Sequence, residues 1–455
     1  MRKYFGTDGI RRIANTELSP ELVYRVAKAG AYVLSKHTDH TPTILIGRDT
    51  RISGTLIESA MTAGFLSYGA NVKILGVMPT PGVAYLTKKL KADASVVISA
   101  SHNTYEFNGV KYFSNKGMKI PDELEEEIEE VMDSGKLDSF SAVNEKIGVS
   151  EIRTDLLDEY VYFFRKNFEE DFENIEMPED FVVAIDTANG ATSVVAEKVF
   201  TALGIKHYIL NNTPNGTNIN DNCGSTHLDV LKKYVIENKC NLGIAYDGDG
   251  DRCLAVDENG NEIDGDKLLA VISNYMKEKG TLKKDTLVAT VMSNLGLRKY
   301  TEENNINFEE TKVGDRYVLE KMLKEGYNLG GEQSGHIIML DYNPTGDGIL
   351  TSLMLIKIIL EKNMSASKIC DIIQIYPQVL VNAKVASNKK QDYEKDPEIK
   401  QEIEKLEKEF SGNGRVLIRP SGTEPLVRVM IEGKDKNYIK TKAESLAKLI
   451  EKKLN

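Results

Sequence analysis

Residues 95–104 read SVVISASHNT, an apolar β-branched run followed at once by small polar side chains. The run at residues 96–98 is typical of a buried strand. A buried strand that ends in a polar loop is where α/β enzymes hold reactive groups. Ser99, Ser101 and His102 could therefore supply an activated hydroxyl, although serine and asparagine also suit an ordinary turn. The other segments of the chain decide between these two interpretations.

The same design, a buried strand and then a polar or glycine-rich loop, recurs along the chain. Helices predicted between the first strands, such as residues 20–35 with Ser19 as the N-cap, give a βαβ alternation. This alternation predicts mainly parallel, doubly wound sheets in three successive α/β units, followed by a compact C-terminal unit. The strands that end in such loops are expected at residues 43–47, 95–98, 181–186, 242–246 and 285–290.

The composition is typical of a globular protein with several domains. A length of 455 residues favours roughly three domains, and a net charge of −11 argues against nucleic-acid binding. The four cysteines form no CxxC pair and no zinc spacing, which indicates buried thiols in a reducing compartment. Because the sequence has no N-terminal signal region and no apolar run of about 18 residues, we expect no membrane association and a cytoplasmic location.

The sequence DGDGDR at residues 247–252 directly follows a predicted strand. Its glycines permit a tight turn, so Asp247, Asp249 and Asp251 can converge on one point. Three clustered carboxylates repel one another unless a hard cation lies between them, and oxygen-only ligands favour Mg²⁺ over zinc. The spacing also imitates an EF-hand loop, but Arg252 stands where that loop requires glycine. We therefore predict a Mg²⁺ site rather than a calcium site or an acidic surface turn.

The sequence RPSGTEP at residues 419–425 offers the chemistry of a phosphate-binding loop. Arg419 can supply a guanidinium fork, and Gly422 can supply accessible backbone N–H groups. Hydroxyls are present at Ser421 and Thr423, and Arg428 follows on the next predicted strand. An ordinary Pro-Gly turn is the alternative for this motif taken alone.

Two further segments carry groups that suit sugar and proton chemistry. In GEQSGH, residues 331–336, Glu332 and Ser334 can bind hydroxyls or an amine, and His336 can act as an acid or a base. Lys111 follows Ser101 by ten residues and can neutralise a phosphoryl group or, with a lowered pKa, accept a proton. A structural histidine and a solvated strand lysine are the alternatives.

One reaction uses a nucleophilic hydroxyl, a Mg²⁺ site, a phosphate clamp and a hydroxyl-binding loop together. It is phosphoryl transfer to and from a sugar phosphate through a phosphoserine. A non-catalytic phosphosugar sensor would not need the intact nucleophile and the three aspartates. A phosphatase would not need so complete a C-terminal clamp.

The order of motifs over essentially the whole chain resembles the α-D-phosphohexomutase superfamily. The resemblance implies an isomerase with three topologically similar mixed-sheet α/β domains and a smaller C-terminal α+β domain around a central cleft. The expected domains are residues 1–155, 156–257, 258–372 and 373–455. The motifs that carry the resemblance are FGTDGIR, GRDTRISG, MPTPGV, ISASHN, GTNIN with NCGSTH, DGDGDR, KVGDRYV, GEQSGH, TGDG and RPSGTEP.

Matching these motifs residue by residue implies a role for each candidate. Ser101 matches the phosphorylated serine, which together with Asp247, Asp249 and Asp251 would hold one Mg²⁺ per chain. The sugar-binding loop is matched by Glu332 and Ser334. Positions around the reacting phosphate and its proton transfers are matched by Arg11, Lys111, Arg252 and His336. The loop that clamps the non-reacting phosphate is matched by Arg419, Ser421, Gly422, Thr423 and Arg428.

The segments GEQSGH and KVGDRYV are most similar to bacterial members that interconvert glucosamine 6-phosphate and glucosamine 1-phosphate. That reaction lies on the pathway to UDP-N-acetylglucosamine, a peptidoglycan precursor. Members that act on mannose and glucose phosphates are the alternative. The resemblance implies a small phosphosugar as the partner and a sugar bisphosphate as intermediate or activator. A homodimer is compatible with it.

The chain departs from the family pattern at two positions. Thr104 stands where the family's SASHNP has proline, so Asn103 loses the extended bias that a following proline imposes. Arg12 stands where glycine is usual, and it would be strained if that site needed a positive φ. Ser99 would share the side of Ser101 if the strand alternation continued, so only the resemblance selects Ser101.

Overall fold

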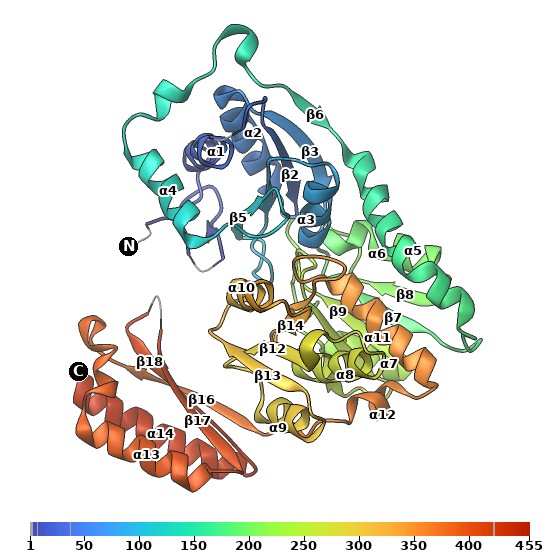
Figure 1. Ribbon diagram of the computed structural model, residues 1–455, viewed down its shortest axis with the longest axis vertical. Coiled ribbons are helices and arrows are strands. Elements are labelled where there is room, and N and C mark those ends of the chain that lie inside the picture. Colours follow the sequence, from blue (N-terminus) through green and yellow to red (C-terminus); the bar gives the residue numbers. More distant parts are fainter. Residues whose placement is uncertain (1–2, 7, 37, 422–423) are drawn as a thin grey trace. The chain divides into compact units, whose positions relative to one another are not determined.

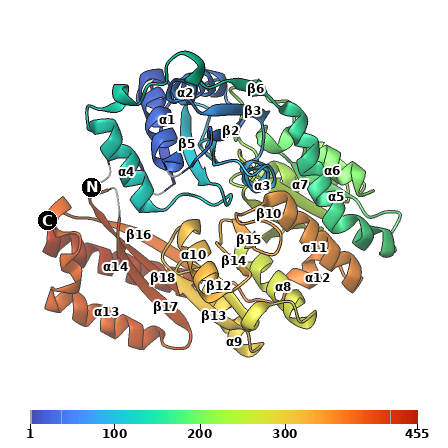
Figure 2. The ribbon, with the colours of Figure 1, turned by 45° about the horizontal axis from the view of Figure 1, so that its top comes forward.

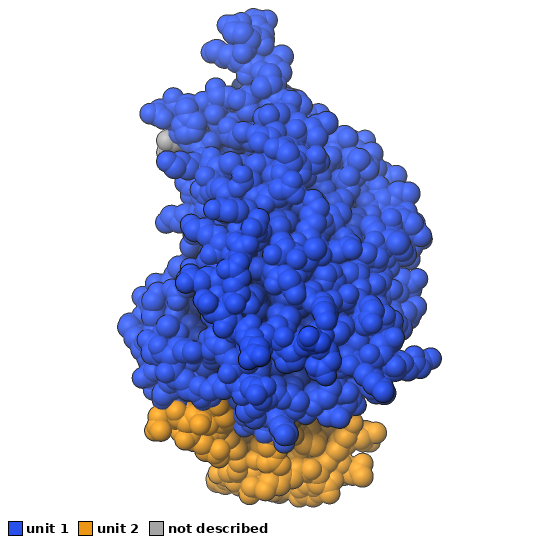
Figure 3. Space-filling model, turned by 90° about the vertical axis from the view of Figure 1, so that its right-hand side faces the viewer, with its two compact units in different colours: residues 1–292, 306–372 blue, residues 293–305, 373–455 orange. Residues whose placement is uncertain are grey.

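The computed structural model describes residues 3–6, 8–36, 38–421 and 424–455 of the chain. It contains two compact units, Met1–Met292 with Ile306–Ile372 and Ser293–Asn305 with Ile373–Asn455 (Figure 3). Among the described residues, three sheets lie in the larger unit and one in the smaller unit. Every helix in this part of the chain is too short or too polar to cross a lipid bilayer.

The first sheet has the strand order β1-β5-β4-β2-β3-β6 (Figure 1). Four of its strands, β4, β2, β3 and β6, are parallel, whereas β5 is antiparallel to both β4 and β1. The strands predicted at residues 43–47 and 95–98 are confirmed to within one residue. The six strands are β1 (Ile10–Ile13), β2 (Thr43–Arg48), β3 (Asn71–Val77), β4 (Ala94–Ile98), β5 (Phe107–Ser114) and β6 (Ser150–Ile152).

Helices cover this sheet on both faces. The first, α1 (Pro20–Ser35), begins where predicted because the Ser19 hydroxyl accepts the N–H of Leu22 and proline occupies its first turn. It lies beside α2 (Gly54–Tyr68) and α4 (Asp122–Asp133) (Figure 2). On the other side, α3 (Thr80–Lys89) packs against α5 (Leu157–Asn174).

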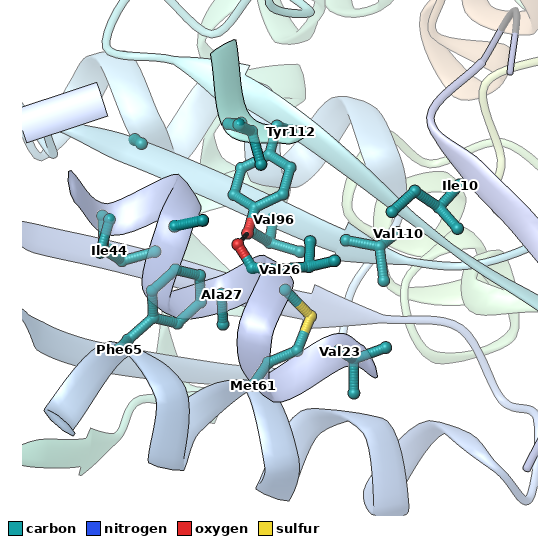
Figure 4. Close-up of a cluster of buried hydrophobic side chains, with 14 of the residues drawn as sticks. Ile10, Val23, Val26, Ala27, Ile44, Met61, Phe65, Val96, Val110 and Tyr112 are labelled. Carbon is teal, nitrogen blue, oxygen red and sulfur yellow. Dashed lines mark hydrogen bonds between the residues drawn. The ribbon is translucent and has the colours of Figure 1, made fainter. Parts of the chain in front are cut away.

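The core of the first sheet follows the alternation of its strands. Ile44 and Ile46 of β2 belong to the apolar core that includes residues of α1 and α2. Gly47 faces the opposite layer, where Val83 of α3 leaves no room for a side chain. The core side chains labelled in Figure 4 include Val26, Met61, Phe65, Val96 and Tyr112.

The second sheet has the strand order β11-β10-β9-β7-β8. Strands β7, β8 and β9 are parallel, and β9, β10 and β11 are antiparallel. The predicted hairpin around residues 258–260 and the predicted strand at residues 242–246 are both confirmed. The elements are β7 (Val183–Asp186), α6 (Ala196–Ala202), β8 (His207–Leu210), α7 (Asp229–Glu237), β9 (Leu242–Tyr246), β10 (Cys253–Asp257) and β11 (Glu262–Ile263).

The third sheet has the strand order β13-β12-β14-β15. Its first three strands are parallel, and β15 is antiparallel to β14. The elements of this part are α8 (Gly265–Glu278), β12 (Thr286–Thr290), β13 (Asn307–Thr311), α10 (Asp315–Glu325), β14 (Leu329–Gly331), β15 (Ile337–Met339), α11 (Gly348–Lys362) and α12 (Ala366–Cys370).

The smaller unit is an α+β structure with the antiparallel sheet β16-β18-β17. It also contains α9, whose N-cap Asn294 exchanges two hydrogen bonds of 2.9 Å with the backbone of Tyr376. Its elements are α9 (Leu295–Glu303), β16 (Gln378–Lys384), α13 (Pro397–Phe410), β17 (Gly414–Pro420), β18 (Leu426–Gly433) and α14 (Lys436–Leu454).

The three sheets of the larger unit share one arrangement that positions the candidate loops. In each sheet a parallel strand is followed by an antiparallel neighbour, so that β4 leads to β5, β9 to β10, and β14 to β15. The loops between these strands are residues 99–106, 247–252 and 332–336, which contain the SASHN, DGDGDR and EQSGH motifs. The predicted class, three similar mixed-sheet α/β domains and a smaller α+β domain, is confirmed, while the four domain boundaries stay a prediction.

The structure also shows whether Arg12, which stands where the family pattern has glycine, has a strained backbone. This residue lies within β1, and its φ is outside the positive region. The strain that a glycine-like site would impose is therefore absent.

Candidate active site

Ser101 follows β4 in a loop with unusual backbone geometry. Its φ of 51° is in the left-handed region, and its amide donates to Ser99 Oγ at 2.9 Å. The strand alternation stops here, and Ser101 Oγ donates to Asp247 Oδ2 at 2.6 Å. Ser99 Oγ instead donates to the buried carboxylate of Asp49 at 2.5 Å. Ser101 is thus the serine that faces the acidic loop, and Ser99 supports the turn.

The carbonyl groups of this loop are held by Arg51, whose side chain is fully buried. Its guanidinium donates to the carbonyls of Ser101 at 2.9 Å, of Asn103 at 2.8 Å, and of Thr104. Asn220 Nδ2 donates to the carbonyls of Ser101 and Asn103 at 2.8 and 2.9 Å. These bonds hold the loop without the proline that the family has at the Thr104 position.

Asp247, Asp249 and Asp251 are buried, and each offers a carboxylate oxygen within 4.8 Å of the others. Burial and the two neighbouring carboxylates raise the pKa of Asp247 well above its usual range. Within the described residues, Asp249 Oδ1 and Asp251 Oδ1 have no hydrogen-bond partner. Buried polar atoms normally have partners, and this donor set consists of oxygen alone. The group therefore fits a hard divalent cation.

Lys111 of β5 reaches the same acidic group from the first sheet. Its buried Nζ lies 2.9 Å from Asp249 Oδ2, 3.2 Å from Asp8 Oδ2 and 3.7 Å from Asp251 Oδ2. Burial lowers the pKa of Lys111, but these carboxylates outweigh it and hold the pKa well above its ordinary value. These contacts favour the charged form of Lys111, and its burial shows that the alternative of a solvated strand lysine is wrong.

A second buried lysine extends this charge network to the third sheet. Lys119 Nζ donates to Asp8 Oδ1 at 2.5 Å and to Asp315 Oδ2 at 2.6 Å. Asp315, at the start of α10, lies 3.5 Å from His336 Nε2. A closed ring of alternating basic and acidic side chains is formed, in order, by Lys111, Asp8, Lys119, Asp315, His336 and Asp251.

His336 has a protein partner at each ring nitrogen. Nδ1 lies 3.5 Å from Asp251 Oδ2, and the amide of Gly346 donates to Nε2 at 3.1 Å. Burial lowers the pKa of His336, but the carboxylates of Asp251 and Asp315 raise it overall. Since the Gly346 bond requires a lone pair on Nε2, this geometry holds the first proton on Nδ1, facing Asp251.

Two arginines lie along the Ser101 loop. Arg11 donates to Asn103 Oδ1 at 3.0 Å and pairs with Asp8 at 3.2 Å. Arg252 Nη1 lies 3.2 Å from His102 Nδ1. Burial, with the charge of Arg252 next, lowers the pKa of His102 to about 4, so this histidine is neutral at neutral pH and can accept the arginine hydrogen.

The loop at residues 332–336 offers a carboxylate and an exposed hydroxyl. Glu332 Oε1 accepts the N–H of Gly314 at 3.1 Å, and burial and the Asp315 charge raise the pKa of Glu332. Gln333 Nε2 donates to Asp264 Oδ2 at 3.2 Å, while Ser334 is exposed. Glu332 and Ser334 are therefore available for a polar ligand.

The predicted phosphate loop lies in the smaller unit. Arg419 of β17 and Arg428 of β18 face each other in register, and burial and the Arg428 charge lower the pKa of Arg419. Ser421 is buried, and its Oγ accepts the N–H of Glu424 at 3.2 Å. Arg428 also pairs with the Glu424 carboxylate at 3.2 Å, and two facing guanidinium groups suit a phosphate clamp. The predicted residues Gly422 and Thr423 lie outside the described residues.

Several residues that shape the site were not singled out from the sequence. Most of them lie within the quoted motifs FGTDGIR, GRDTRISG, MPTPGV, GTNIN and KVGDRYV, so the motifs carried a signal without selecting the residue. Lys119 lies in none of these motifs. The residues are Asp8, Asp49, Arg51, Thr80, Lys119, Asn220 and Asp315.

Comparison with known families accounts for nearly the whole chain. Residues 2–138 match the alpha/beta/alpha domain I of phosphoglucomutase/phosphomannomutase, and residues 158–260 match domain II. Residues 264–376 match domain III, and residues 380–449 match the C-terminal domain.

Relatives and solved structures extend over the full length. Phosphoglucosamine mutases of Clostridium acetobutylicum and Acetivibrio thermocellus are 53% and 51% identical, each with 100% of both chains covered. A phosphoglucomutase/phosphomannomutase family protein of Burkholderia thailandensis has a TM-score of 0.79 at 20% identity, covering 99% of this chain and 98% of that one. An Aspergillus fumigatus N-acetylphosphoglucosamine mutase, in complex with GlcNAc-6P and magnesium, has a TM-score of 0.70 at 16% identity, covering 100% and 96%. The structural likeness supports the fold, and the sequence matches show that the chain belongs to the phosphoglucomutase/phosphomannomutase family and is a phosphohexomutase, an isomerase.

Proposed function

We propose that the protein interconverts glucosamine 6-phosphate and glucosamine 1-phosphate through a phosphoserine at Ser101. The observation that carries this proposal is the Ser101 hydroxyl, which donates to Asp247 at 2.6 Å beside the buried acidic group. The choice of sugar rests on the full-length relatives that are named phosphoglucosamine mutase and share about half of their residues with this chain.

The reaction begins with phosphate on Ser101 Oγ. A free sugar hydroxyl loses its proton and attacks the phosphorus, and its new O–P bond forms as the bond from phosphorus to Ser101 Oγ breaks. The product of this step is a sugar bisphosphate. Once it has turned over in the site, its other phosphate returns to Ser101, so the bisphosphate is both the intermediate and the reagent that charges the enzyme.

The cations around Ser101 suit the transfer of an anionic group. Lys111 is buried, and neighbouring carboxylates raise its pKa, while Arg11 and Arg252 lie along the Ser101 loop. We assign these three residues to charge balance around the transferred phosphoryl group. His336 is assigned to proton transfer, because its buried ring lies beside Asp251 and Asp315, whose carboxylates raise its pKa.

The acidic group is assigned to one Mg²⁺ per chain. Asp247, Asp249 and Asp251 would hold it together with an oxygen on Ser101, and two of their buried oxygens lack a hydrogen-bond partner in the described chain. When bound, Mg²⁺ would supply electrostatic stabilisation of the charge that develops during transfer.

The remaining candidates are assigned to substrate binding. Glu332 and Ser334 would bind the sugar, and the carboxylate of Glu332 suits the ammonium group that distinguishes glucosamine from glucose. The RPSGTEP loop would hold the phosphate that does not react, which is supported by the facing pair Arg419 and Arg428. With this division, one catalytic centre serves both orientations of the bisphosphate.

The predicted place of the reaction, on the route to UDP-N-acetylglucosamine in the cytoplasm, follows from the proposed substrate and stays a prediction. The predicted homodimer also stays a prediction.

A side-by-side assay of the phosphorylated enzyme tests the proposal. We expect glucosamine 6-phosphate to give a higher kcat/KM than glucose 6-phosphate or mannose 6-phosphate, because Glu332 pairs with its amine. The Ser101→Ala variant, folded as judged by circular dichroism, should lose turnover of all three sugars. A preference for the glucose or mannose phosphate would favour the phosphomannomutase/phosphoglucomutase alternative, and full activity of Ser101→Ala would refute the phosphoserine route.

A further inference from the structure

Thr80, the first residue of α3, contacts the acidic loop that follows β9. Its hydroxyl donates to Asp249 Oδ2 at 2.6 Å, and its backbone N–H donates to Asp249 O at 2.9 Å. Both residues are buried, with exposed fractions of 0% for Thr80 and 1% for Asp249, so bulk water does not compete for either bond. One residue beside the first sheet therefore holds both the backbone and the side chain of a proposed metal ligand in the second.

The sequence MPTPGV at residues 78–83 explains why Thr80 is available for this contact. The first N–H groups of a helix have no partner within the helix, so the N–H of Thr80 can donate outside it. The approach of the acidic loop requires a glycine. A Cβ at Gly250 would lie 2.6 Å from Thr192 Cγ2 and 3.3 Å from Pro79 Cβ. The glycine in the middle of the DGDGDR motif thus allows the loop to lie against the start of α3.

The two carboxylate oxygens of Asp249 have different surroundings. Oδ2 accepts two hydrogen bonds, from the Thr80 hydroxyl at 2.6 Å and from Lys111 Nζ at 2.9 Å. Oδ1 is buried and has no hydrogen-bond partner in the part of the chain that the structure describes. Because a carboxylate oxygen has two lone-pair sites, two donors saturate Oδ2. Oδ1 is the oxygen that remains for a cation.

Thr80 and Lys111 contribute to this arrangement in different ways. Lys111 Nζ also lies 3.2 Å from Asp8 Oδ2 and 3.7 Å from Asp251 Oδ2, so its charge acts on three carboxylates. The Thr80 hydroxyl donates to Asp249 alone among the described residues. Since a hydroxyl is neutral, it orients the carboxylate and leaves the negative charge that attracts a cation.

We propose that Thr80 is a positioning residue for the Mg²⁺ site, and that its hydroxyl holds Asp249 so that Oδ1 faces the cation. This inference rests on the proposed function, because it takes Asp249 as a Mg²⁺ ligand. Loss of a side chain that holds a metal ligand typically weakens metal binding about 10- to 100-fold. Mg²⁺ demands near-ideal octahedral geometry, whereas Ca²⁺ accepts flexible coordination. A carboxylate that is free to rotate should therefore weaken Mg²⁺ binding more than Ca²⁺ binding.

Isothermal titration of the full chain with MgCl₂ and with CaCl₂ tests this role, with the phosphorylation state of each protein matched by intact mass. Thr80→Val keeps the shape and the backbone N–H but removes the hydroxyl. It should raise the dissociation constant for Mg²⁺ about 10- to 100-fold, with a smaller rise for Ca²⁺. Thr80→Ser keeps a hydroxyl and should bind Mg²⁺ nearly as the wild type does.

The matched control is Thr87→Val, two turns further along the same helix. Thr87 is also buried, and its hydroxyl bonds to Val83 O and Ser95 Oγ, both at 2.7 Å. The control thus removes a buried hydroxyl that contacts no candidate site residue. It should leave the affinity for both cations unchanged.

Several results would overturn the proposal. They are an unchanged Mg²⁺ affinity in Thr80→Val, a Thr80→Ser variant as weak as Thr80→Val, and equal losses in Thr80→Val and Thr87→Val or for the two cations. If the wild type binds Mg²⁺ in these cases, the proposed function stands and this inference alone fails. A wild type that binds no Mg²⁺ would overturn the metal assignment as well. If Thr80→Val failed to fold, as judged by circular dichroism, Thr80→Cys would replace it, and its weakly donating thiol should give a smaller loss of Mg²⁺ affinity.

Discussion

The bonds of Arg51 predict how much the phosphoserine loop depends on one side chain. Arg51 is among the largest fully buried side chains, it pairs with the buried Asp49 at 2.8 Å, and it donates to the carbonyls of Ser101, Asn103 and Thr104. Replacement by methionine keeps much of the volume but leaves the Asp49 carboxylate without its cation. Breaking a buried pair in this way costs about 3–5 kcal/mol. That is a large share of a typical stability of about 5–15 kcal/mol.

Guanidinium unfolding of the larger unit measures this cost. Arg51→Met should lower the guanidinium concentration at the unfolding midpoint by an amount equivalent to about 3–5 kcal/mol. The dependence of the unfolding free energy on guanidinium concentration should not change. The substitution should also lower kcat about a hundredfold, because a displacement of about 1 Å at the reacting atom has that effect. The matched control is Arg165→Met, which removes the exposed helix pair with Glu169 and should cost about 0.5 kcal/mol. Equal midpoints for the two variants would refute the assigned role of Arg51.

Three further predictions concern charge, metal and backbone. Burial raises the pKa of Asp347 from 3.8 to about 6, so its stabilising contribution is complete below about pH 4 and is lost as the pH rises through 6. The unfolding free energy of the wild type relative to Asp347→Asn should therefore fall by about 2 kcal/mol from pH 4 to pH 7, and a constant difference would contradict this. Mg²⁺ at 100 times its dissociation constant should stabilise the wild type by about 2.7 kcal/mol, seen as a higher melting temperature, and Asp249→Asn should abolish the shift. A Cβ at Gly248 would lie 2.5 Å from Ser101 O, so Gly248→Ala should separate the two loops and lower kcat, and unchanged kinetics would count against their contact.

Regular elements were predictable where local signals agree. The strand at residues 242–246 has a continuous apolar run bounded by polar residues, and α1 has both a serine cap and a proline in its first turn. Each signal acts over a few residues, so no knowledge of distant neighbours was needed. The βαβ alternation alone predicted mainly parallel sheets, and their mixed character was implied only by the family resemblance.

The functional residues were predictable when the chemistry lies in one short motif. Asp247, Asp249 and Asp251 alternate within six residues, and the structure brings them together. Lys119 could not be found in this way, because it meets Asp315 across 196 positions. The protonation of Lys111 was equally hidden, since it depends on carboxylates from two distant segments. The sequence predicted a less rigid loop at Thr104, because the buried Arg51 that holds its carbonyl is 53 positions away and was not singled out.

The most direct test of the central claim is mass spectrometry of the enzyme after incubation with glucosamine 1,6-bisphosphate. Intact mass should show one added phosphoryl group, and peptide mapping should place it on Ser101. Addition of glucosamine 6-phosphate should then remove this group, with glucosamine 1,6-bisphosphate as the product. An unmodified Ser101, or a phosphoryl group on Ser99 instead, would contradict the account.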